Sequence, residues 1–198
     1  MKNEFEIVGL FYKIDDYKCR KYLDIKLKSS KITNPDLMVI MMNPGSSYPL
    51  DGIDDNSVPS SAKPDKTQEQ IIKVMKNNAL DYARILNLSD LRTPNSNELY
   101  TFLKSKNLKS IPHTIFGKNR VEDFDSLFIK NVPVIYAWGV NSALKELAKL
   151  AITKINNLSP LGLKKDSEEY AYYHPLPRIY NNQVEWVEKV SQQMLSRL

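Results

Sequence analysis

The sequence predicts an α/β fold in a single domain of 198 residues. Short β-rich runs at residues 37–42, 84–88 and 134–138, and a fourth run that ends at Tyr173, alternate with segments of helical periodicity. The run at residues 37–42 is apolar at every position, which is typical of a strand covered on both faces. Alternation of strands and helices predicts parallel strands between helix layers. We therefore expect a three-layer α/β/α sandwich with a central sheet of four mostly parallel strands.

The N-terminal region has a different pattern. Residues 5–12 and 18–27 are β-rich runs separated by Ile14-Asp15-Asp16-Tyr17, which predicts a β-hairpin. We assign residues 1–35 to this hairpin, as an appendage, and residues 36–198 to the core of the domain.

Five helices are expected after the first buried strand, and most have a start signal. Residues 45–66 form a long polar loop, which in a compact domain is usually functional or disordered. Thr67 and Gln70 then form a capping-box pattern, Asn95-Ser96 precedes the second helix, and Asn181-Asn182 precedes the last. The helices are expected within residues 67–82, 96–105, 121–129, 143–155 and 183–198.

Composition excludes several classes of protein. Cys19 is the only cysteine and there are two histidines, so we expect no internal disulfide, no iron–sulfur cluster, no metal and no cofactor. No apolar run approaches the roughly 20 residues of a membrane span, and the first residues lack a signal-peptide pattern. The expected location is therefore the cytoplasm, without membrane contact.

The net charge of +5 is concentrated in one segment. Residues 101–120 contain five basic residues and no acid, namely Lys104, Lys106, Lys109, Lys118 and Arg120. Such a segment can bind a phosphate backbone, so these residues are candidates for nucleic-acid binding. The alternative is an ordinary solvated loop.

Two strand ends carry the candidate site. Asn43-Pro44-Gly45 follows the first buried strand directly, because Pro44 ends the ladder and Gly45 permits a sharp turn. His174-Pro175 follows the fourth predicted strand. Ligands of open α/β sheets bind at the carboxyl ends of the strands, so we expect Asn43 and His174 to face one pocket. Alternatively, Asn43 caps a turn and His174 is a packed core histidine.

An ordered series of short motifs resembles a known family. The series is Met42-Asn43-Pro44, Asp65-Lys66-Thr67, Asn87-Leu88-Ser89-Asp90-Leu91-Arg92, Trp138-Gly139, Leu161-Gly162-Leu163-Lys164-Lys165-Asp166 and His174-Pro175. In this order the motifs resemble the bacterial and phage family of domain of unknown function 1643, over roughly residues 36–198.

A more distant likeness concerns chemistry. The pattern strand-Asn-Pro-Gly, strand-Gly and strand-His-Pro-x-Pro-helix is similar to the uracil-DNA glycosylase superfamily. That resemblance implies the strand order 2-1-3-4, with Asn43 positioning the attacking water and His174 stabilising the departing base. It also places Arg178 at the wedge position and suggests Tyr48 as a stacking aromatic.

These observations lead to two hypotheses. The first is a protein that recognises a nucleobase or nucleotide, with N-glycosidic hydrolysis on nucleic acid by Asn43 and His174 as its activity. The second is a non-catalytic module that binds a nucleotide, a phosphate or a protein. Under either hypothesis, the expected substrate-binding residues are Pro44, Gly45, Ser46, Tyr48, Asn87, Arg92, Trp138, Gly139 and Arg178. Turn formation by Asn87 and a core position for Trp138 are the structural alternatives.

Overall fold

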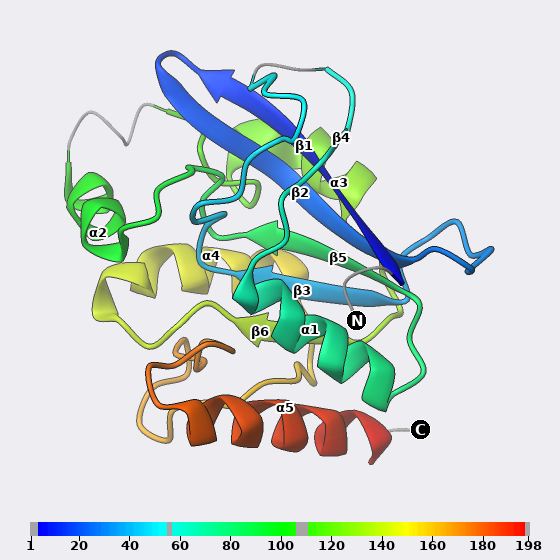
Figure 1. Cartoon of the computed structure of the whole chain (residues 1–198). Helices are drawn as coiled ribbons and strands as arrows, with labels where there is room; N and C mark the ends of the chain where they lie inside the picture. Colours follow the sequence, from blue (N-terminus) through cyan, green and yellow to red (C-terminus); the bar gives the residue numbers. More distant parts are fainter. Residues whose placement is uncertain (1–3, 55–56, 106–110, 197–198) are drawn as a thin grey trace.

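The computed structural model describes residues 4–54, 57–105 and 111–196 and contains one mixed sheet with helices on both faces (Figure 1). Six strands form the sheet in the order β4-β1-β2-β5-β3-β6. Their bounds are β4 Ser60–Ser61, β1 Phe5–Ile14, β2 Tyr17–Leu27, β5 Tyr82–Asn87, β3 Leu37–Met41 and β6 Val134–Ala137.

The expected sheet of four mostly parallel strands is wrong. Only β5, β3 and β6 run parallel to one another, with β3 in the middle. The hairpin β1–β2 is antiparallel and does not stand apart, because β2 pairs antiparallel with β5 through Leu23 opposite Ile85. The short β4 extends the same sheet by pairing with β1. The hairpin was expected from its local pattern, whereas its pairing with β5 joins residues about 60 positions apart.

The fourth predicted strand, which was to end at Tyr173, is also wrong. Residues 161–173 instead fold back on themselves: Tyr173 donates its N–H to Leu163 O at 2.8 Å, and Lys165 donates to Ala171 O at 2.9 Å. At the edge of β6, Leu161 exchanges hydrogen bonds with the backbone on either side of Ile135, and Tyr172 forms a single bridge with Gly139 just after the strand. The hydrogen-bonding groups of this segment are therefore largely satisfied locally, and it does not extend the sheet.

Helices on the two faces bury separate parts of the core. Helices α1 (Lys66–Asn77) and α5 (Tyr180–Leu195) pack on one face, where Met75 and Trp186 join a cluster with Val39 and Ile85. Helices α2 (Ser96–Lys104), α3 (Val121–Leu127) and α4 (Lys145–Ile155) pack on the other. Two short 3₁₀ helices, η2 (Lys118–Arg120) and η3 (Ser142–Leu144), precede α3 and α4.

Two helix starts differ from those expected. The N-cap of α1 is Asp65, not Thr67: its carboxylate accepts the Gln68 N–H at 2.9 Å, and the Gln68 side chain accepts the Asp65 N–H at 3.2 Å. The capping box is therefore formed by Asp65 and Gln68, and it lies two residues before the expected pair of Thr67 and Gln70. Helix α5 begins at Tyr180, with Ile179 as N-cap and no side-chain cap. The N-cap of α2 is Asn95, as expected.

The long loop after β3 lies along the outer edge of the hairpin. Pro49 forms a bridge with Ala62, and Lys63 donates its N–H to Tyr48 O at 3.1 Å. This packing covers part of an edge strand that would otherwise expose unpaired backbone groups. Within the described ranges of the chain, no helix is long and apolar enough to cross a membrane.

Candidate functional site

A pocket of about 340 Å³ lies where β3 ends, on the face of the sheet that carries α1. Its floor is formed by side chains of β2, β3 and β5, including Leu23, Met41 and Ile85. Its rim is formed by the turn after β3, the first residues of α1, Thr93-Pro94 and the segment at His174. Its volume is within the range of small-molecule sites, which starts at about 300 Å³.

Asn43 lines this pocket from the turn after β3. The turn is sharp because Pro44 ends the strand and Gly45 adopts a φ of +61°, which glycine reaches without steric cost. The Asn43 Nδ2 group donates to Leu91 O at 3.1 Å and to Thr93 O at 2.8 Å. These two bonds fix the orientation of the amide, and its Oδ1 meets no protein donor among the described residues. That oxygen is therefore the atom of Asn43 that can accept a hydrogen bond from a bound molecule.

His174 lines the same pocket although no strand directly precedes it, so the residue after β3 and the residue of the fourth predicted strand end are brought together. Its Nδ1 accepts the Leu176 N–H at 3.1 Å, which places the ring proton of the neutral form on Nε2. Burial lowers the pKa of His174 to about 4, although the nearby Asp65 carboxylate acts in the opposite direction. At neutral pH the imidazole is uncharged and offers one donor, Nε2–H.

Two buried donors in the pocket were missed by sequence reasoning. Arg20 is only 3% exposed and Gln68 only 2%. Nε of Arg20 and Nε2 of Gln68 have no hydrogen-bond partner, and the Arg20 guanidinium forms no ion pair with any described residue. Burial lowers the pKa of Arg20 to about 10, so the group remains charged at neutral pH.

A β-bulge explains why Arg20 was missed. Strict alternation along β2 would put Arg20 on the face of Tyr22, which packs against α2–α4. The register shifts at this point, however: Tyr22 lies opposite Leu10 and Arg20 opposite Phe11, which leaves Lys21 as the extra residue. The bulge moves Arg20 to the other face, beside Leu23 in the pocket. A single sequence contains no clear signal for this shift.

The N-terminus of α1 forms one wall of the pocket. Asp65, Lys66, Thr67 and Gln68 all line it. Asp65 caps the Gln68 N–H, but the N–H groups of Lys66 and Thr67 have no acceptor within the described chain. Helix N-termini carry partial positive charge and unsatisfied N–H groups, so this wall favours acceptor atoms on a ligand.

Of the other expected binding residues, Pro44, Gly45 and Ser46 line the pocket, and three at or just after the ends of β5 and β6 do not. Trp138 is fully buried in the core and donates its indole N–H to Tyr170 O at 2.7 Å. Gly139 donates its N–H to Tyr172 O at 2.7 Å. Asn87 is fully buried at the end of β5, and neither polar atom of its side chain has a partner.

The remaining three lie outside the pocket lining. Tyr48 is 40% exposed and lies beneath the Lys63 ammonium, 5.2 Å from its ring centroid. The Arg92 guanidinium donates to Ser47 O at 2.6 Å and forms an ion pair with Asp54, so it ties down the loop after β3. Arg178 is exposed in the turn before α5.

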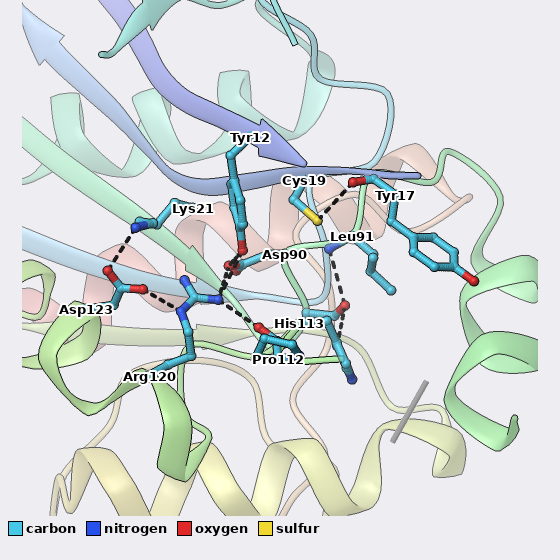
Figure 2. A network of polar contacts seen from close by, with 11 residues as sticks. Tyr12, Tyr17, Cys19, Lys21, Asp90, Leu91, Pro112, His113, Arg120 and Asp123 are labelled. Atoms are coloured by element: carbon cyan, nitrogen blue, oxygen red, sulfur yellow. Dashed lines mark hydrogen bonds and ion pairs between the residues drawn. The ribbon is translucent and has the colours of Figure 1, made fainter. Parts of the chain in front are cut away.

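The lysine-rich segment does not present its five basic residues together. Lys104 and Lys118 are exposed, whereas Lys106 and Lys109 lie outside the described residues. Arg120 is buried in a polar network on the far face of the sheet (Figure 2). Its Nη1 donates to Asp90 Oδ2 at 3.1 Å and its Nε to Asp123 Oδ2 at 2.5 Å, so its guanidinium is committed to the protein.

The same network holds Tyr12 and the second histidine (Figure 2). Tyr12 donates its hydroxyl to Asp90 Oδ2 at 2.6 Å. His113 Nδ1 lies 2.9 Å from Ser89 Oγ, and burial with the nearby Arg120 charge lowers the pKa of His113 to about 4. Burial raises the pKa of the Cys19 thiol to about 12, which does not favour a thiolate nucleophile. Within the described ranges, no three His, Cys, Asp or Glu side chains are grouped to hold a metal ion.

Comparison with known proteins places the chain in a family. No curated protein and no solved structure matches it. The family model described as protein of unknown function (DUF1643) matches residues 22–176, which is most of the chain and includes Asn43 and His174. The likeness to uracil-DNA glycosylases gains no support from these comparisons, and the sheet differs from the one that it implied. The chain therefore belongs to the DUF1643 family of proteins of unknown function.

Proposed function

We propose that the pocket at the end of β3 binds a nucleobase-containing molecule and that Asn43 and His174 act on its N-glycosidic bond. The observation that supports this is their presence in one 340 Å³ pocket with complementary hydrogen-bonding groups. Asn43 offers a fixed acceptor, Oδ1, and His174 a neutral donor, Nε2–H.

The two groups suit the two ends of the reaction. A water molecule donating to Asn43 Oδ1 is oriented to attack the sugar carbon, and Asp65, the acidic side chain in the lining, takes up its proton. As the glycosidic bond breaks, the base leaves with the bonding electron pair. The His174 Nε2–H then donates to the developing negative charge, a kind of stabilisation worth on the order of 3–4 kcal/mol.

Two substitutions of His174 test this role. Asparagine keeps an acceptor near the position of Nδ1, which can still bond the Leu176 N–H, but removes the donor at Nε2. Glutamine keeps an N–H donor near the position of Nε2. Release of free base should be lost in His174→Asn and partly retained in His174→Gln. The substrates are nucleosides, nucleotides and oligonucleotides that contain uracil or hypoxanthine, with base release measured by chromatography.

The matched control is His113→Gln, because His113 is the other histidine and lies outside the pocket. Its base release should equal that of the wild type at a temperature at which both are folded. Equal activity of wild type, His174→Asn and His174→Gln would contradict the proposed role of His174.

A second candidate is binding without catalysis. Both N–H groups of the Asn43 amide hold the 91–93 segment in place. This role is structural and needs no catalysis. Under this alternative no base is released from any substrate, and the ligand is recovered unchanged after saturating the pocket. Arg92, one of the expected binding residues, takes no part in this binding because it is paired with Asp54.

A further inference from the structure

The strongest unexplained feature of the pocket is its set of buried donors without acceptors. Arg20 Nε and Gln68 Nε2 have no partner among the described residues, although both side chains are at least 97% buried. Burying a charge or a polar group without a partner is costly, so such a group calls for a partner from outside the chain, such as water, an ion or a ligand. Both side chains line the same pocket, so a bound molecule can supply the missing acceptors.

The groups around Arg20 define the chemistry of that molecule. The N–H groups of Lys66 and Thr67, at the first turn of the twelve-residue α1, also lack acceptors in the part of the chain that the structure describes. The lining contains the cations Arg20 and Lys66 and the carboxylate of Asp65, while His174 is neutral, so its net charge is positive. The donors of the Arg20 guanidinium, the N-terminus of α1 and the Gln68 amide together suit an anion with several oxygen atoms.

A terminal phosphate fits this arrangement better than the backbone of a nucleic acid. A phosphate monoester has three free oxygens for the several donors, and only one side of it is attached to the rest of the ligand. A phosphodiester has two free oxygens and needs an exit for the chain on both sides. Arg20 lies at the floor of the pocket, on the sheet, where a free small molecule can place one end.

We propose that Arg20, Gln68 and the N-terminus of α1 bind the terminal phosphate of a free mononucleotide, an inference that rests on the proposed function for the nucleobase part. The substrate class is then a nucleoside monophosphate, and Arg20 determines specificity for it over the nucleoside. This assignment differs from action on a base within a DNA strand, which the resemblance implied.

The test compares wild type, Arg20→Met and Arg20→Lys by isothermal titration calorimetry. The probes are inorganic phosphate, AMP and UMP, the nucleosides adenosine and uridine, and a single-stranded oligonucleotide without terminal phosphates. A mononucleotide should bind the wild type roughly 10- to 100-fold more tightly than its nucleoside, as expected for hydrogen bonds to a charged group. Arg20→Met should abolish that difference and Arg20→Lys should retain part of it.

Thermal unfolding without ligand shows whether Arg20→Met is folded. Replacing an unpaired buried charge by an apolar side chain is neutral or stabilising, so the melting temperature should stay the same or rise by about 2–4 °C. Lys149→Met is the control for the loss of one positive charge, because Lys149 is exposed on α4, across the sheet from the pocket. Its affinity for every probe should equal that of the wild type.

The outcomes separate this inference from the proposed function. Nucleosides that bind as tightly as mononucleotides, with no effect of Arg20→Met, would overturn the phosphate site and leave the proposed function standing. Phosphate binding that depends on Arg20, without any nucleotide binding, would support the anion site but contradict the proposal that the pocket binds a mononucleotide. The inference would be overturned if the oligonucleotide bound more tightly than the mononucleotides. It would also be overturned if no probe bound at a concentration 10-fold above about 1 mM.

Discussion

Arg120→Met tests whether the buried pair of Arg120 and Asp90 is structural (Figure 2). Asp90 is fully buried and Arg120 is 8% exposed, so removing the guanidinium leaves a carboxylate without its partner inside the protein. Breaking a buried ion pair in this way costs about 3–5 kcal/mol. Urea unfolding at pH 8, followed by the fluorescence of Trp138 and Trp186, should show a loss of this size.

The loss of stability in Arg120→Met should depend on pH, and the direction of this dependence follows from the protonation of Asp90. Burial raises the pKa of Asp90 to about 6, although Arg120 and the Tyr12 hydroxyl oppose the rise. Without Arg120 the folded-state pKa rises further, so the variant takes up a proton at a higher pH than the wild type. As the pH falls from that value to about 6, the deficit of the variant should shrink by about 1.4 kcal/mol per pH unit.

The double variant Asp90→Asn/Arg120→Met is the control, because it removes both charges of the buried pair. It should be more stable than Arg120→Met at pH 8, and the cycle of variants isolates the coupling between the two side chains. A loss below about 1 kcal/mol, or an equal loss at pH 8 and pH 6, would refute the reasoning.

Three further predictions concern stability. In Gly162→Ala, the new Cβ would lie 2.4 Å from Tyr136 O at a φ of +129°, so urea unfolding should show a loss of about 2–4 kcal/mol; an unchanged midpoint would contradict this clash. Asp65→Ala should cost about 1 kcal/mol through loss of the α1 cap, whereas Thr67→Ala should cost little, and equal losses would argue against Asp65 as N-cap. His113 has a folded-state pKa of about 4, below its unfolded value of about 6.5, so the unfolded state binds more protons between these values and the wild type loses stability as the pH falls through this window. His113→Gln should lack that part of the loss, up to about 3 kcal/mol, and stability curves that run parallel from pH 7 to pH 4 would disprove it.

Local pattern was enough for the strand and turn that carry Asn43. The apolar run before Asn43 and the turn residues after it predicted both a buried strand and its end, because side-chain burial and the limits of proline and glycine are local properties. The expectation that Asn43 and His174 share one pocket agrees with their positions in the structure. Their chemical roles stay predictions.

Only the tertiary structure decided how distant parts of the chain combine. The pairing of β2 with β5 brought the hairpin into the sheet, and one extra residue at Lys21 turned Arg20 into the pocket. The same packing buried Arg120 against Asp90, although its sequence neighbours suggested an exposed basic segment. Sequence periodicity reports which residues are apolar along one element. Strand partners, bulges and ion pairs depend on contacts between residues far apart in the chain, and these form only when the whole sheet is assembled.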